Sequence, residues 1–66
     1  MRARLLKRIT EAVSELNLGI PVSLFKTQPL RAINRALTLT GAPRIPNLQS
    51  EAALRRAASA LEGAVS

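Results

Sequence analysis

The chain contains no cysteine, histidine, tyrosine, tryptophan or aspartate, and it has a single phenylalanine. Without cysteine no disulfide can form, and without cysteine or histidine a structural zinc site lacks its usual ligands. A Ser-His or Cys-His nucleophilic pair cannot be assembled from the remaining side chains. We therefore expect a protein that is not an enzyme, with no catalytic residue, cofactor, metal or small-molecule substrate.

Long apolar runs are also missing. No uninterrupted apolar stretch approaches the roughly 20 residues that a membrane-spanning helix needs. The N-terminus begins with basic residues, but charges interrupt the apolar positions that follow, unlike the continuous apolar region of a signal peptide. We expect no membrane span and a cytoplasmic location.

What is present is a short, strongly basic chain. Its 66 residues carry ten Lys or Arg and four glutamates, which gives a formal charge of +6. This length predicts a single small domain over residues 1–66, which the apolar spacing described below makes helical. A chain of this size buries only about 60% of the surface that its unfolded form exposes. Its stability must therefore come from tight helix packing, self-association or docking on a larger partner.

The apolar spacing predicts an all-α fold, with three short helices at about 2–18, 28–39 and 51–62 in a small bundle. The first is the most regular, with apolar side chains at helical intervals and charged ones on the opposite face. Gly19 follows it as a left-handed stop. The apolar stripe of this helix consists of Leu5, Leu6, Ile9, Ala12, Val13 and Leu16.

Helix boundaries for the other two segments follow from capping residues and breakers. Thr27 is a suitable cap for the second helix, and Pro29 is tolerated only in a first turn. Residues 41–49 form a proline-containing linker, because prolines favour an extended backbone in the residues before them. Ser50 is the expected cap of the third helix, which should end at Gly63.

The connection at 20–27 is predicted to be extended or irregular, with two alternatives left open. Alternating apolar residues at 20–25 are typical of a strand, but Pro21 removes a hydrogen-bond donor. One helical turn over 23–26 fits equally well. With a strand, the element order would resemble part of a ribbon-helix-helix protein. Phe25 is expected in the core, since binding surfaces that stack bases usually carry more than one ring.

One helix face carries the strongest functional pattern. Arg31 and Arg35 are four residues apart, with Asn34 and Thr38 close by. Guanidinium, amide and hydroxyl groups are the donors that contact phosphates and base edges in nucleic acids. The sequence predicts a nucleic-acid-binding surface here, extended by further cations at Arg4, Lys7, Arg8, Arg55 and Arg56.

Two functions follow from these features. The first is a small, basic protein that binds nucleic acid, DNA in particular, or has a regulatory role; we expect it to be a dimer that uses arginine-rich helix faces, since each phosphate neutralised releases counterions. The alternative is a protein-interaction module: a small inhibitor, accessory subunit or assembly component that docks on a larger complex or forms a homodimer. The alternative rests on the alanine-rich stripe of the third helix, which is too thin to cover a monomeric core well.

Overall fold

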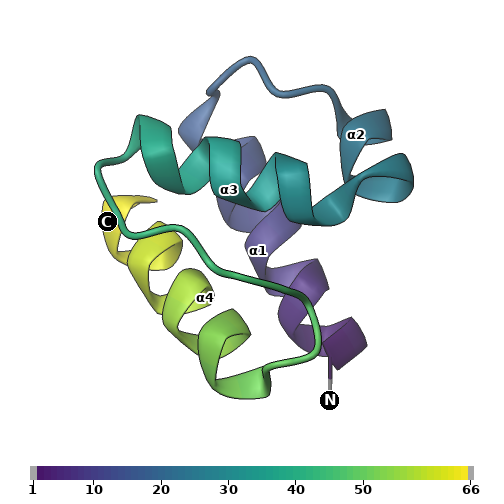
Figure 1. The fold of residues 1–66 in the computed structure, drawn as a ribbon. Helices are drawn as coiled ribbons and strands as arrows, with labels where there is room; N and C mark the ends of the chain where they lie inside the picture. The colour runs from purple at the N-terminus through teal and green to yellow at the C-terminus, as the bar shows by residue number, and fades with distance from the viewer. Residues whose placement is uncertain (1, 66) are drawn as a thin grey trace.

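The computed structural model describes residues 2–65, which form four α-helices (Figure 1). They are α1 (Arg2–Leu16), α2 (Val22–Thr27), α3 (Pro29–Leu39) and α4 (Glu51–Val65). The predicted all-helical class is confirmed, since no strand occurs in this range. Within the same residues, no helix combines the length with the hydropathy that crossing a bilayer requires.

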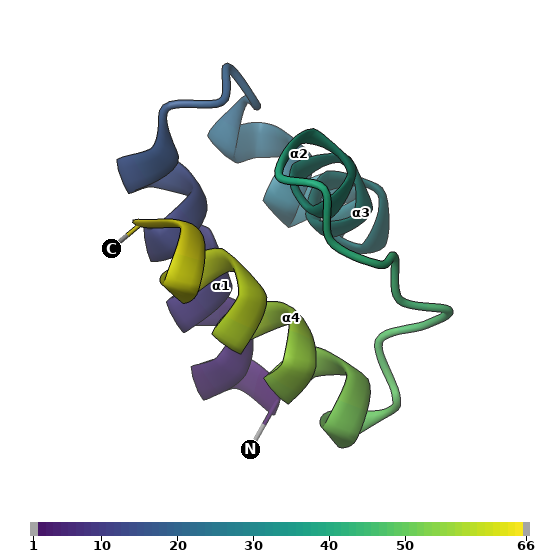
Figure 2. The ribbon, with the colours of Figure 1, turned by 90° about the vertical axis from the view of Figure 1, so that its left-hand side faces the viewer.

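Helices α1 and α4 form the main packed pair, although they lie at opposite ends of the sequence. They run side by side in the same direction, and α3 crosses them steeply, so that Figure 2 shows α3 nearly end-on. Residues 40–50 lead from the end of α3 back to the start of α4. This segment must be long because it spans the molecule before α4 can begin beside the start of α1 (Figure 1).

Within the part of the chain that the structure describes, the core contains five large side chains with essentially no exposure, together with buried alanines from α1, α3 and α4. The alanine-rich stripe of α4 is fully covered. The whole chain exposes 4381 Å², close to the roughly 4,100 Å² expected for a compact protein of this mass. Phe25, which was expected in the core, is only half-buried and packs against the edge of the core. The five large side chains are Ile9, Ile33, Leu37, Leu54 and Leu61.

Helix α1 ends at Leu16, two residues before the predicted end. Asn17 already has a left-handed backbone with φ of 53°, and Gly19 follows with φ of 76°. Asparagine tolerates this region better than most residues do, so the chain turns earlier than a glycine-based stop predicts. The left-handed role of Gly19 itself is confirmed.

The expected extended or irregular connection at 20–27 is corrected for residues 22–27, which form α2. Pro21 stands at the N-cap with φ of −63°, and its carbonyl accepts the Leu24 N–H at 3.0 Å. The helical alternative forms because a lone strand would leave its backbone groups without a partner. The strand-first order of a ribbon-helix-helix protein is therefore absent from residues 2–65.

Two other predicted helix boundaries need correction. Thr27 does not cap α3: Gln28 occupies that position, and the Thr27 hydroxyl donates back to the Ser23 carbonyl at 3.0 Å. Pro29 does open α3 as expected. Helix α4 continues through Gly63 to Val65, since a glycine can also adopt helical angles.

The start of α4 is as predicted. The Ser50 hydroxyl accepts the Ala53 N–H at 3.2 Å, and Glu51 lies in the first turn, where it complements the helix dipole.

Candidate functional site

The outer face of α3 is set by the pattern of its buried residues. Ala32, Ile33, Ala36 and Leu37 all face the core with no exposure. With 3.6 residues per turn, Arg31, Arg35 and Thr38 then lie on the opposite side of the helix, and all three are exposed. The structure thus presents both predicted arginines to solvent on one surface.

A groove of about 460 Å³ runs beside this face, and a third arginine lines it. Arg44 comes from the segment between α3 and α4, which sequence reasoning treated only as a linker. We call this surface the arginine groove and define it by Arg31, Arg35 and Arg44. Among residues 2–65, no carboxylate lines it; the remaining lining residues are Leu30, Asn34, Thr38 and Leu39.

Among the described residues, little neutralises these guanidinium groups. Arg31 Nη1 donates to Gln28 Oε1 at 3.4 Å, near the limit for a hydrogen bond. No ion pair to Arg31, Arg35 or Arg44 occurs among the ion pairs of residues 2–65. The groove therefore offers cationic donors to an external anion.

Asn34 lines the same groove but uses its side chain differently from the prediction. Its Nδ2 donates to the Ile45 carbonyl at 3.0 Å, and its Oδ1 accepts the Ile45 N–H at 2.8 Å. Both amide atoms are thus engaged with the chain's own backbone. Asn34 holds the 40–50 segment against α3 rather than presenting a free amide to a base edge.

The other predicted cations lie on α1 and α4, away from the arginine groove. Arg4, Arg8 and Arg55 line a hollow of about 210 Å³ with Glu51, at the starts of the two parallel helices. Arg55 approaches Glu51 at 3.5 Å. Lys7 and Arg56 are exposed and line neither this hollow nor the arginine groove.

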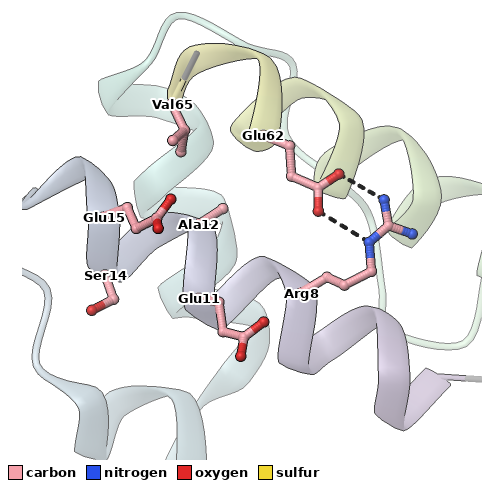
Figure 3. Close-up of a pocket in the computed structure, with 7 residues that line it drawn as sticks. All are labelled: Arg8, Glu11, Ala12, Ser14, Glu15, Glu62 and Val65. Carbon is pink, nitrogen blue, oxygen red and sulfur yellow. Dashed lines mark hydrogen bonds and ion pairs between the residues drawn. The ribbon is translucent and has the colours of Figure 1, made fainter.

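Three of the four glutamates line a separate pocket of about 600 Å³ between α1 and α4. Figure 3 shows Arg8 of α1 reaching Glu62 of α4, with Glu11 and Glu15 following along α1. Arg8 donates two hydrogen bonds to Glu62, Nε to Oε2 at 3.0 Å and Nη2 to Oε1 at 2.6 Å. This hydrogen bonding, helped by the positive charge of Arg8, lowers the pKa of the Glu62 carboxyl.

The pocket between α1 and α4 contains an ion pair between helices and otherwise exposed carboxylates, which favours a structural role over a binding site. Glu62 is committed to Arg8, and Glu11 and Glu15 are exposed, as expected for a solvated helix flank. Within residues 2–65, no group of three metal-ligating side chains is placed to hold a metal ion. Carboxylates thus line this pocket together with Arg8, whereas no carboxylate of residues 2–65 lines the arginine groove.

Large exposed apolar side chains are scattered over three helices. Val22 of α2 is 61% exposed, Leu39 of α3 is 51% exposed and Val65 of α4 is 40% exposed. Leu39 lines the arginine groove beside Leu30. Val22 lines a hollow of about 170 Å³ together with the partly buried Leu18, Ile20 and Phe25.

Comparisons with family models, curated proteins and solved structures gave no significant match.

Proposed function

We propose that the chain binds nucleic acid through the arginine groove. The observation that carries this proposal is the convergence of Arg31, Arg35 and Arg44, from two different segments, on one groove that no carboxylate of the described residues lines. Arginine is always charged, and its planar donors match phosphate oxygens in pairs. A polyanion that follows the groove can meet all three guanidinium groups at once.

Phosphate contact is favoured over base stacking as the mode of binding. Phe25, the single aromatic residue, packs half-buried against the core from α2, and it does not line the arginine groove. Surfaces that bind single strands usually stack successive bases on aromatic rings. The groove supports a duplex ligand that is held by its backbone, with little discrimination between base sequences.

The alternative function, docking on a larger protein, has less support. It rested on an α4 stripe too thin to cover the core, and that stripe is buried. Leu39 in the arginine groove is the feature that still favours it, because an exposed leucine beside arginines resembles protein interfaces. A regulatory role, self-association and a cytoplasmic location remain predictions from the sequence.

Binding of a labelled duplex DNA, followed by fluorescence anisotropy over a range of salt concentrations, tests the proposal. Three phosphate contacts predict a slope of log K against log salt of about −2.7. Arg31→Ala with Arg35→Ala should flatten this slope by about 1.8. The matched control is Lys26→Ala with Arg56→Ala, which removes the same charge from exposed sites outside the groove.

The two double variants separate a local site from general attraction. An equal loss of slope in both would mean that net charge alone drives binding, and the groove would have no special role. Affinity that is independent of salt in the unaltered protein would refute phosphate binding altogether. A single strand of the same length should bind more weakly than the duplex, because the groove has no ring on which its bases can stack.

A further inference from the structure

The 40–50 segment is joined to α3 by a two-way hydrogen-bonded contact. Asn34 donates to the carbonyl of Ile45 and accepts from its N–H, at 3.0 Å and 2.8 Å. Ile45 is only 4% exposed and belongs to the core cluster. Its backbone groups need partners because buried peptide groups cannot be left unpaired without cost. The Asn34 amide provides both partners from one side chain.

This contact also determines where Arg44 lies. Pro43 and Pro46 fix their own φ angles and favour an extended backbone in the residues before them, so the short stretch between them is stiff. Successive side chains of an extended segment point in opposite directions. With Ile45 directed into the core, Arg44 is directed outward, and it is exposed and lines the arginine groove.

We infer that Asn34 is a positioning residue: it holds the 40–50 segment so that Arg44 faces Arg31 and Arg35 across the groove. This inference rests on the proposed function, and it adds the 40–50 segment to α3 as a second element that lines the groove. A nucleic-acid backbone in the groove is then held from α3 on one side and from Arg44 on the other. Because the segment is fixed before binding, less ordering is required when the ligand arrives.

A double-mutant cycle on duplex binding tests the inference. Arg44→Ala should reduce the salt slope by about 0.9, the effect of one phosphate contact. Asn34→Ala should reduce the slope in the same direction because Arg44 is no longer held. The combined variant should bind no more weakly than Arg44→Ala alone, since Asn34 acts through Arg44.

Asn47→Ala is the matched control. Asn47 lies in the same segment, and its Oδ1 accepts the N–H groups of Gln49 and Ser50 at 3.0 and 3.1 Å. The Asn47→Ala variant therefore also loses two hydrogen bonds. Asn47 does not line the groove, so its variant should keep the full salt slope even though its stability falls. Circular dichroism shows whether each variant is folded at the assay temperature. If Asn34→Ala is unfolded, Asn34→Gln replaces it, because one added methylene prevents the paired geometry.

The outcomes distinguish this inference from the proposed function. Fully additive losses for Asn34 and Arg44, or an unchanged slope in a folded Asn34 variant, would overturn the positioning role while leaving the groove in place. So would an unchanged slope in Arg44→Ala when Arg31→Ala still weakens binding. If the unaltered protein binds no duplex DNA, the proposed function and the inference both fail.

Discussion

Leu54→Ala is the most direct test of how this small core is held together. Leu54 has no exposure and is one of only five large side chains that are fully buried among the described residues. It lies on α4, whose other buried residues are three alanines and Leu61. Because alanines contribute little apolar area, the α4 side of the core depends heavily on its two leucines.

The expected effect is large relative to the total stability. Truncation of a buried leucine to alanine costs about 2.7–5.0 kcal/mol, because a cavity is left in addition to the lost transfer energy. A chain of 66 residues has a total free energy of unfolding of roughly 3–10 kcal/mol. Its unfolding entropy near 60 °C is about 0.14 kcal/mol per kelvin. The midpoint should therefore fall by roughly 20 °C or more, or folding should be lost entirely.

Thermal unfolding followed by circular dichroism at 222 nm, a standard helix wavelength, would measure this shift. Leu39→Ala is the matched control, since Leu39 is the same residue type on a helix but is 51% exposed. An exposed substitution of this kind changes stability by only about 0.5 kcal/mol. Equal shifts in the two variants would refute the packing described for α4.

Two further predictions concern single polar contacts. Arg8 lowers the pKa of the Glu62 carboxyl in the folded protein. This ion pair therefore stabilises the folded state at pH values above the pKa that Glu62 has in the unfolded chain. Its contribution is lost as the pH falls through the lower pKa of the folded state. The difference in melting temperature between the unaltered protein and Glu62→Gln should therefore be present at neutral pH and disappear in acid; a difference that does not change with pH would contradict this. Ser50→Ala should cost about 1 kcal/mol because it removes the cap of α4, whereas Ser59→Ala, on the exposed face of the same helix, should not destabilise. Urea titration measures the free energy of unfolding of both serine variants, and equal values for the two would contradict the role of Ser50 as the cap.

Elements with strong local signals could be predicted from the sequence. Three features follow from patterns within a few neighbouring residues, and the structure contains all of them. They are the buried stripe around Ile9 and Val13, the proline that opens α3 and the serine cap of α4. The helix at 22–27 could not be settled, because alternation of apolar residues over six positions fits a strand and a short helix equally. Only the absence of a partner strand decides between them, and that is a property of the whole chain.

In the candidate site, too, residues with local signals could be predicted and a residue placed by a distant contact could not. Arg31 and Arg35 were predictable, because their exposure follows from the helix period once the buried stripe is identified. Arg44 was missed because its place in the groove depends on a contact between residues 34 and 45, across the end of α3, a turn and Pro43.

A signal for that contact does exist in the sequence. Ile45 is a large apolar residue in a proline-bounded linker, so its burial is favoured while its backbone groups have no helix or strand to pair with. Asn34, on the flank of α3, carries both a donor and an acceptor and fits that requirement. An asparagine in such a position is therefore better interpreted first as a partner for buried backbone, and only then as a contact to a ligand. Under that interpretation the residue next to the buried one, here Arg44, becomes the candidate for the binding surface.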